Sequence, residues 1–305
     1  MISETFTLPS FAKINWMLDV LGKRQDGFHE ISTIYQTVDL CDRLTFKPSE
    51  VFSLSCSDPT IPLGEKNIVY RAAEALAKSH GLKATGSIHI EKNIPSPGGL
   101  GGGSSNAAIC LLGCSLLWGI EPAEDELVAI GASLGSDVPF FFAGGTALGG
   151  GRGEVITPIS DVEEPFMIIV SPRFGVETAS AFRALNADFL TENTENPNLL
   201  VSRLEGGRLN VGSASLTNHF EDSVFKRFPE IELIQSKLIE CGARTARMSG
   251  SGSSVFAVFD KEETRQATLE AIRDKDWRMF AVATLSRSSY REALKPCHRL
   301  FPISF

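Results

Sequence analysis

The feature that most constrains the fold of this chain is a glycine-rich segment between a strand-like stretch and a helix-like stretch. The segment reads PSPGGLGGGSSNAA over residues 95–108, and five glycines surround Leu100 within residues 98–103. It follows the strand-like residues 87–91 and runs directly into the apolar residues 107–118. Gly/Ser linkers join polar segments, whereas this segment joins a strand to an apolar helix. The pattern therefore favours a functional loop over a flexible linker.

A loop of this composition is well suited to bind an anion. Without Cβ atoms the backbone approaches a ligand closely, and several N–H groups can point into one concavity. The N-terminus of the following helix adds unsatisfied donors and about half a positive charge. Ser104 and Ser105 add hydroxyls that can bind a phosphate oxygen or a magnesium ion. We expect the loop to hold a nucleotide triphosphate, and a valine at Gly102 to project into the phosphate site.

The loop is neither of the two common nucleotide-binding types. No Gly-Lys-Ser/Thr follows the glycines, which excludes the Walker type. No parallel βαβ unit with a ribose-binding acid is apparent, which argues against the dinucleotide-binding fingerprint. A different glycine-loop architecture is therefore expected.

The remaining chain mixes strands and helices without strict alternation, which predicts an α+β fold with mainly antiparallel sheets. Residues 159–165 (ISDVEEP) are polar and end in proline, so they indicate a boundary between two domains, 1–160 and 161–305. The expected strands are 6–21, 31–40, 43–47, 51–56, 87–91, 146–148, 154–156, 166–171, 246–248, 255–259 and 279–285. The expected helices are 67–80, 105–118, 123–134, 178–185, 199–204, 230–241 and 261–273.

Composition and charge exclude several classes of protein. The chain of 305 residues carries 37 acidic and 29 basic side chains, a net charge of −8, which argues against a nucleic-acid or anionic-lipid binder. Its longest apolar runs have strand length, far short of the ~20 residues that span a bilayer. The N-terminus lacks the basic start and apolar core of a signal peptide. We expect no membrane segment and a cytoplasmic location.

The six cysteines predict neither a zinc site nor a disulfide framework. They contain no CxxC pair and no histidine at metal-ligand spacing. Cys110 and Cys114 are four residues apart, so a helix would place them on one face. We expect both to be small buried residues in a reducing compartment.

A second glycine-rich turn, SGSGSS at residues 249–254, precedes the expected strand 255–259. Taken alone, it is explained by a tight turn between two strands. Alternatively, its glycines let it pack against the first loop and supply further donors. The residues leave both interpretations open.

With both turns in place, the sequence resembles the GHMP kinase superfamily, which includes galactokinase, homoserine kinase and mevalonate kinase. Members carry a Pro-x-x-x-Gly-Leu-Gly-Ser/Gly-Ser-Ser-like ATP loop and a late glycine-rich motif. Three stretches carry the likeness: PSFAKINWMLDVLGKRQDGFHEISTIYQTVDLCD, GASLGSDVPFFFAGGTALGGGRGEVITPI and RMSGSGSSVFAVF. The first narrows it to the branch that phosphorylates the 2-hydroxyl of a cytidine diphosphate derivative of methylerythritol in non-mevalonate isoprenoid biosynthesis. The resemblance spans residues 9 to about 285 and is weakest over 186–220.

The resemblance implies a two-domain fold with the active site in the interdomain cleft, and a kinase that uses ATP and Mg²⁺. It leaves the metal ligands open. It places Asn67 near the adenine, although from the residues alone Asn67 is simply a good helix N-cap. The implied residues of the ATP loop are Pro95, Ser96, Pro97, Gly98, Gly99, Leu100, Gly101, Gly102, Gly103, Ser104 and Ser105.

The resemblance also implies a catalytic pair. Asp137, in Gly-Ser-Asp-Val-Pro, matches the catalytic base, and a carboxylate can accept the proton of the attacking alcohol. On its own it is an ordinary turn aspartate. Lys13 is placed beside it, where its charge would favour the ionised carboxylate. Without the resemblance, Lys13 is explained as a solvent-facing lysine of a strand.

Further residues are implied at the acceptor substrate. Asn15 projects from the same face of the strand as Lys13 and can form a hydrogen bond there. Phe28 is expected to stack on the cytosine and His29 to form a hydrogen bond with it. The family's usual residue at position 28 is Tyr, so Phe keeps the ring and lacks the hydroxyl. Phe182, one helical turn after Thr178, matches a second aromatic wall. Without the resemblance, His29 is explained as a surface histidine in a turn and Phe182 as a core residue of an amphipathic helix.

Two other functions are weighed against this one. A sister kinase that acts on homoserine or mevalonate is disfavoured by Asp-Gly-Phe-His at residues 26–29. A non-catalytic binding module of the same fold is disfavoured because Lys13 and Asp137 are both present.

Overall fold

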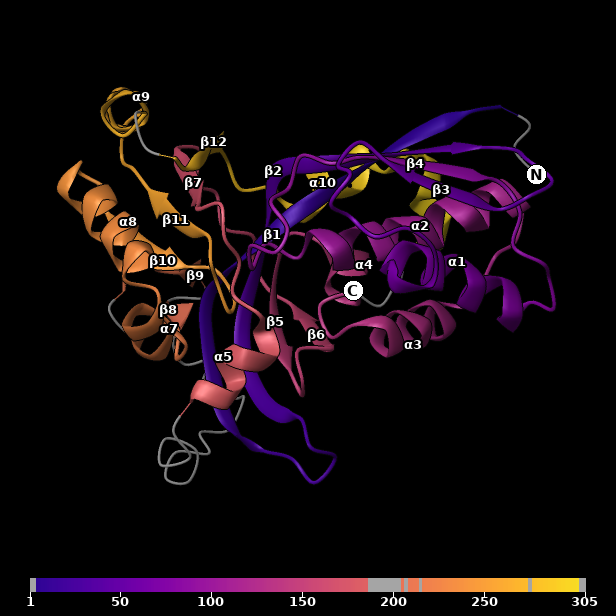
Figure 1. Cartoon of the computed structure of the whole chain (residues 1–305), viewed down its shortest axis with the longest axis horizontal. Coiled ribbons are helices and arrows are strands. Elements are labelled where there is room, and N and C mark those ends of the chain that lie inside the picture. The colour runs from indigo at the N-terminus through magenta and orange to yellow at the C-terminus, as the bar shows by residue number, and fades with distance from the viewer. Residues whose placement is uncertain (1–3, 186–203, 206–207, 214–215, 274–275, 302–305) are drawn as a thin grey trace.

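Two long antiparallel strands run through the structure and connect its two halves. The computed structural model describes residues 4–185, 204–205, 208–213, 216–273 and 276–301. Strand β1 (Phe6–Lys23) pairs with β2 (His29–Lys47), as the indigo ribbons of Figure 1 show. The sequence predicts two strands where β2 is one. The expected break is a bulge instead: Phe11 pairs with Cys41 and Ala12 with Val38.

The first sheet is built around this hairpin. Its strand order is β3-β4-β2-β5-β6, with β1 paired to β2, and only β3 and β4 run parallel. Four helices pack against it on one side (Figure 1). The added strands are β3 (Ser53–Cys56), β4 (Ser87–Glu91), β5 (Thr146–Gly150) and β6 (Val155–Pro158). The helices are α1 (Ile68–Ser79), α2 (Gly102–Trp118), α3 (Glu124–Leu134) and α4 (Phe140–Ala143).

The second sheet is fully antiparallel, with strand order β10-β11-β7-β12. Its strands are β7 (Met167–Ser171), β10 (Thr245–Met248), β11 (Val255–Val258) and β12 (Arg278–Val282). Around it lie α5 (Thr178–Ala184), α7 (Glu221–Arg227), α8 (Pro229–Glu240), α9 (Glu262–Ala271) and the small hairpin β8 (Leu204–Glu205) and β9 (Arg208–Leu209). The predicted α+β class with mainly antiparallel sheets is confirmed. The helix expected over 199–204 lies outside the described residues except for Leu204, which is in β8.

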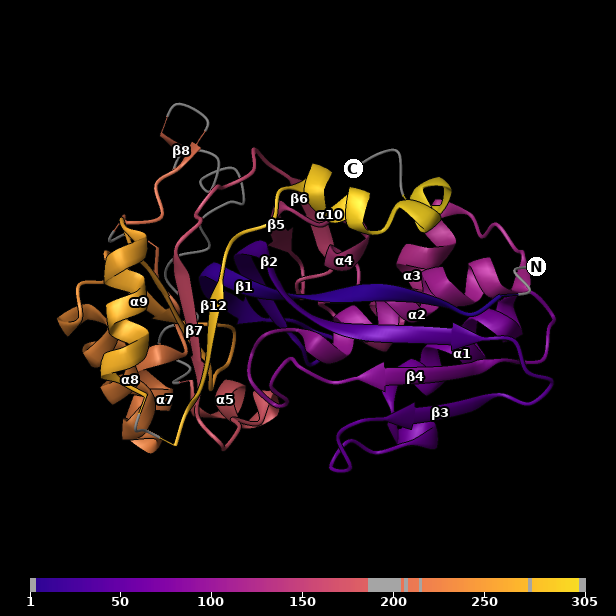
Figure 2. The ribbon, with the colours of Figure 1, turned by 90° about the horizontal axis from the view of Figure 1, so that it is seen from above.

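The end of the chain returns to the first half of the molecule. Helix α10 (Arg287–Ala293) and the 3₁₀ helix η3 (Lys295–Leu300) lie beside α2, α3 and α4 (Figure 2). The Tyr290 hydroxyl donates to the Phe141 carbonyl at 2.6 Å, and Tyr290 and Leu294 are buried in the same apolar cluster as α2. Residues 287–301 therefore complete the N-terminal core. The sequence patterns did not predict α10.

Helix α2 is the central element of that core. It is apolar around its circumference, and most of its residues are buried. It begins at Gly102, three residues before the expected start, and ends at Trp118, where Gly119 with a φ of 67° stops it. Cys110 and Cys114 are buried with their sulfur atoms 3.8 Å apart, as predicted for two small core residues. Within the described ranges, no helix has the length and apolarity needed to cross a membrane.

Close packing at Gly113 of α2 gives a stability prediction. A Cβ there would lie 2.2 Å from Cζ of Phe46, so the ring would have to move. Alanine gains about 1 kcal/mol of helix propensity over glycine, but overpacking a core costs about 1–3 kcal/mol. We expect Gly113→Ala to lower the free energy of unfolding in a urea titration. Gly103→Ala in the same helix is the control, because its Cβ would meet only Ile68 at 3.7 Å; equal stability of the two variants would contradict the packing.

Candidate active site

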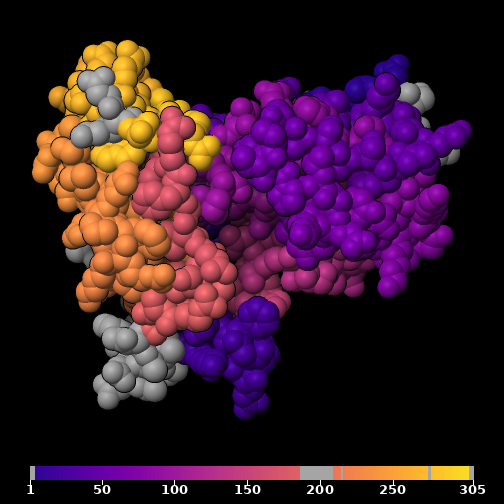
Figure 3. Space-filling model, in the orientation of Figure 1, coloured from indigo at the N-terminus to yellow at the C-terminus, as the bar shows by residue number. Residues whose placement is uncertain are grey.

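A cavity of about 370 Å³ lies between the two halves of the molecule. Figure 3 shows the recess between the C-terminal part, in salmon and orange, and the N-terminal part, in purple. Both halves line the cavity: the first contributes β1, the glycine loop and Asp137, and the second contributes α5 and the turn at Gly250. The predicted site residues that line it are Lys13, Asn15, Asp137, Thr178, Phe182, Pro95, Ser96, Pro97, Gly98, Gly99, Leu100, Gly101, Gly102, Gly103 and Ser104.

The glycine loop connects β4 to α2 along one wall of this cavity. Its Leu100 carbonyl accepts a hydrogen bond from the backbone N–H of Lys13 at 2.9 Å. Gly101 has a φ of +67°, and a Cβ there would lie 2.9 Å from Cγ of Lys13. Gly102 differs, because its φ is not positive and a Cβ would meet Ile94 at 3.0 Å. The expectation that a valine at Gly102 enters the phosphate site is therefore wrong, since the side chain would be directed at Ile94.

The second glycine turn packs against the first, as one of the two interpretations proposed. The Ser249 hydroxyl donates to the Gly99 carbonyl at 2.9 Å, and the Ser254 N–H donates to the Gly98 carbonyl at 3.1 Å. A Cβ at Gly99 would lie 2.1 Å from the Ser249 carbonyl oxygen, so glycine is required for this approach. The contact brings Gly250 into the cavity wall.

Lys13 and Asp137 face each other in the cavity. Lys13 Nζ lies 3.2 Å from Asp137 Oδ2, and the lysine side chain is 4% exposed while the aspartate is 31% exposed. The ammonium also donates to Asn15 Oδ1 at 2.6 Å, and Asn15 Nδ2 donates to Thr33 Oγ1 at 2.8 Å. These bonds orient Lys13 and Asn15 toward the same space. The arrangement presents a partly exposed carboxylate and a fixed positive charge to whatever occupies the cavity.

Tyr35 is a second contact of Asp137, and the sequence analysis missed it. Its hydroxyl donates to Asp137 Oδ1 at 2.9 Å, and its ring stacks on Phe140 at 4.9 Å. Burial, followed by the negative charge of Asp137, raises the pKa of Tyr35 well above its usual range, so it stays a donor. No local sequence pattern marked Tyr35; the register of β1 and β2, in which it pairs with Asn15, brings it to the site.

A second cavity of about 640 Å³ adjoins the first and shares Ser136, Arg152, Thr178 and Phe182 with it. Phe28 and His29 line this second cavity. The His29 ring, and not the Phe28 ring, stacks on Phe182. Their ring centroids are 4.7 Å apart and the angle between the ring planes is 16°.

Phe28 lies farther out, and Arg152, which the sequence analysis did not single out, covers its ring. Phe28 is 52% exposed, which excludes a core role. The Arg152 guanidinium carbon lies 4.7 Å from its ring centroid. The Arg152 Nε is also paired with Glu154 at 3.2 Å. Arg152 thus presents a cation where the two cavities meet.

Two of the predicted residues have other contacts. Ser105 is buried outside the cavity lining, and its hydroxyl lies at hydrogen-bond distance from Ser10 Oγ, 2.7 Å. Asn67 uses both ends of its amide in local structure: Oδ1 accepts from the Val69 N–H at 2.8 Å, and Nδ2 donates to the Pro62 carbonyl at 2.7 Å. Ser105 therefore faces the core and not the cavity, which corrects its expected role in the ATP loop. Asn67 is the N-cap of α1, and its place near the adenine stays a prediction.

Family models match both halves of the chain. The GHMP kinases N terminal domain matches residues 67–145, and the GHMP kinases C terminal model matches residues 201–277. A solved structure of a homoserine kinase from Cytophaga hutchinsonii has the same fold, with a TM-score of 0.69 at 18% identity over 94% of this chain and 96% of that one. The chain belongs to the GHMP kinases.

Proteins that are more similar to this chain than the homoserine kinase show to which group of GHMP kinases it belongs. The 4-diphosphocytidyl-2-C-methyl-D-erythritol kinase of Clostridium kluyveri is 38% identical over 91% of this chain and 99% of its own length. The enzyme of the same name from Geobacter metallireducens is 39% identical over 92% of this chain and 99% of its own length. A crystal structure of 4-(cytidine 5'-diphospho)-2C-methyl-D-erythritol kinase matches with a TM-score of 0.76 at 30% identity, over 92% and 99% of the two chains. Within the GHMP kinases, the chain belongs to this family of ATP-dependent small-molecule kinases.

A Cβ would point to Lys13 at Gly101 and to Ile94 at Gly102, and this difference gives a prediction for the site. Alanine at Gly101 must adopt a left-handed conformation, which costs about 1–2 kcal/mol, and it presses on Lys13. We expect Gly101→Ala to lower kcat/KM for ATP by about tenfold or more. Gly102→Ala is the matched comparison, and we expect a smaller loss because its Cβ is directed at Ile94. Steady-state kinetics on both variants decide, and an equal loss in both would contradict the geometry.

Proposed function

We propose that this chain transfers the γ-phosphoryl group of ATP to the 2-hydroxyl of 4-diphosphocytidyl-2-C-methyl-D-erythritol, a step of non-mevalonate isoprenoid precursor biosynthesis. One observation carries the proposal: the Lys13–Asp137 pair, at 3.2 Å, lies in a cavity with the glycine loop on one wall. That cavity continues into the one lined by Phe28 and His29. The first suits a triphosphate and the second suits a flat base.

The residues divide the work of phosphoryl transfer. The reaction depends on positioning, charge stabilisation and an acceptor for the hydroxyl proton. In our proposal, the Asp137 carboxylate accepts that proton. Lys13 is held by Asn15 and directs its ammonium at the reacting oxygens, where it stabilises developing negative charge. The free N–H groups at the start of α2 donate to the phosphates.

Magnesium fits the donors that face the cavity. In the described part of the chain, no group of three or more His, Cys, Asp or Glu residues could hold a metal ion. Mg²⁺ commonly needs no such cage, because it keeps water ligands and uses one or two carboxylates together with substrate phosphates. Ser104 lines the cavity and offers a hydroxyl oxygen, whereas both oxygens of Asp137 are already bonded, to Lys13 and to Tyr35. When bound, Mg²⁺ would neutralise phosphate charge; we propose Ser104 as its protein contact, with water and the phosphates as its other ligands.

The second cavity offers groups for a cytidine diphosphate. Burial, and then the charge of Lys23, lowers the pKa of His29, so its imidazole is neutral at pH 7 and offers one donor and one acceptor to a base edge. Arg152 lies where the two cavities meet, and a guanidinium is suited to phosphate oxygens. We propose that Thr178 and Phe182 complete this acceptor site. We also propose a cytoplasmic location, which the six free cysteines support.

An acceptor panel tests the proposed substrate. ATP consumption is measured with the cytidine diphosphate derivative of methylerythritol, methylerythritol phosphate, homoserine and mevalonate. We expect turnover only with the first. Comparable turnover of homoserine or mevalonate would overturn the assignment.

The base role of Asp137 gives a second test. Asp137→Asn keeps the shape of the side chain and loses its basicity, so the rate should fall by about 10²–10⁴-fold. ATP affinity, measured by calorimetry, should change little, because the glycine loop holds the nucleotide. The melting temperature serves as a folding control. A variant that keeps more than about a tenth of the rate would remove Asp137 from the base role.

Phe28 tests the acceptor site. Because Phe28 is half exposed, Phe28→Leu should change stability by less than about 0.5 kcal/mol. Loss of the aromatic face should weaken acceptor binding by about 1–3 kcal/mol and leave ATP binding unchanged. Phe28→Tyr, which keeps the ring, is the matched control. Unaltered acceptor affinity in the leucine variant would take Phe28 out of the site.

A further inference from the structure

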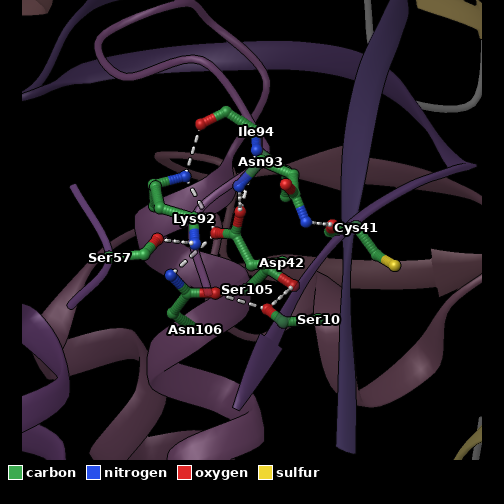
Figure 4. A network of polar contacts seen from close by, with 9 residues as sticks. All are labelled: Ser10, Cys41, Asp42, Ser57, Lys92, Asn93, Ile94, Ser105 and Asn106. Carbon is green, nitrogen blue, oxygen red and sulfur yellow. Dashed lines mark hydrogen bonds and ion pairs between the residues drawn. The ribbon is translucent and has the colours of Figure 1, made fainter. Parts of the chain in front are cut away.

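One buried carboxylate, that of Asp42 in β2, holds both flanks of the glycine loop (Figure 4). Asp42 is fully buried. Its Oδ1 accepts the backbone N–H groups of Asn93 and Ile94 at 2.7 and 2.8 Å, directly before the loop. Its Oδ2 accepts the side-chain amide of Asn106 at 2.9 Å, in the first turns of α2 directly after the loop. The two ends of residues 95–105 thus meet at a single side chain.

The network requires a group that only accepts hydrogen bonds. Lys92 Nζ is the fourth donor to Asp42, at 2.8 Å from Oδ2, and it also donates to the Ile94 carbonyl. An ionised carboxylate has two oxygens and no hydrogen, so it can satisfy all four donors. Lys92 is 5% exposed and does not line the cavity between the two halves. Its charge therefore compensates Asp42 and is not directed at a ligand.

The same network reaches the strand that carries Lys13. The Ser10 hydroxyl donates to Asn106 Oδ1 at 2.6 Å and lies 2.7 Å from Ser105 Oγ. Ser10 is three residues before Lys13 on β1. Asn106 is thus held from one side by Asp42 and from the other by β1. The network therefore connects the start of α2, the residues before the loop and strand β1, which carries Lys13.

We infer that Asp42 is a positioning residue for the nucleotide site. A glycine-rich loop has many accessible conformations, and holding its two ends together selects those in which its N–H groups converge. Asp42 does not line the cavity, so it acts through the loop and touches no substrate. The inference rests on the proposed role of the loop in binding ATP.

Asp42→Asn is the direct test. The variant replaces one carboxylate oxygen of Asp42 by an NH₂ group. In one orientation of the amide this group faces the N–H groups of Asn93 and Ile94, and in the other it faces the donors on Lys92 and Asn106. We expect ATP affinity, measured by calorimetry, to fall about tenfold, with KM for ATP raised in parallel. KM for the acceptor should stay within about twofold, because the network does not reach the second cavity.

Exchanging the two side chains gives a rescue. In Asp42→Asn combined with Asn106→Asp, the new amide can accept from Asn93 and Ile94 and donate to the new carboxylate, which also accepts from Ser10. The net charge of the network is unchanged, but Lys92 now faces the amide nitrogen and keeps only the Ile94 carbonyl. We expect a partial recovery, with ATP affinity about threefold or more above that of Asp42→Asn.

A matched control separates positioning from general stability. Asp161 also accepts two backbone N–H groups, from Thr146 at 2.9 Å and from Arg287 at 2.8 Å, but it ties β5 to α10. Asp161→Asn should lower the melting temperature and leave ATP affinity unchanged. If Asp42→Asn does not fold, Asn106→Leu removes the tie between Asp42 and α2 together with the Ser10 hydrogen bond, and it should still weaken ATP binding.

The outcomes are distinct. The inference is overturned if the folded Asp42 or Asn106 variant binds ATP as the unmodified protein does, if Asp161→Asn weakens ATP equally, or if a folded exchanged pair gives no recovery. An unmodified protein that binds no ATP would instead overturn the proposed function of the loop.

Discussion

The contact between the two glycine turns is the constraint on which the rest of the site depends. One turn joins β4 to α2 in the first half, and the other joins β10 to β11 in the second half. Gly99 and Ser249 approach so closely that no Cβ fits, and two hydrogen bonds to the Gly98 and Gly99 carbonyls hold them there. A cavity lined by both halves follows from this contact, because each turn contributes part of its wall.

The long hairpin then supplies most of the reactive groups. Lys13 and Asn15 come from β1, and Tyr35 lies opposite Asn15 on β2. His29 begins β2 at the far end of the same hairpin. A single hairpin therefore spans from Lys13 to the cavity lined by His29, so in the proposed reaction it sets the distance between the reacting hydroxyl and the recognised base. Sites built on strands hold their geometry better than sites built on loops.

Local patterns in the sequence predicted the parts of this structure that depend on neighbouring residues. The strand–loop–helix unit around Leu100, the amphipathic helix α1 with its N-cap Asn67 and the pairing of turn and strand at 249–259 are of this kind. Local patterns did not predict contacts between distant residues; the contact of Lys13 with Asp137 was implied by the resemblance alone. Tyr35 meets Asp137 across 102 positions, and Ser105 faces the core because Ser10 lies beside it. A domain boundary near residue 160 stays a prediction, and α10 packs across it onto the first core.

The central claim is that the paired glycine turns hold the triphosphate with its terminal phosphate opposite Lys13 and Asp137. A crystal structure of the protein with a non-hydrolysable ATP analogue and the cytidine diphosphate acceptor tests it most directly. The account predicts phosphate oxygens bonded to the N–H groups of residues 98–104 and the acceptor 2-hydroxyl beside Asp137. Phosphates bound away from the glycine loop, or an acceptor hydroxyl with no contact to Asp137, would contradict it.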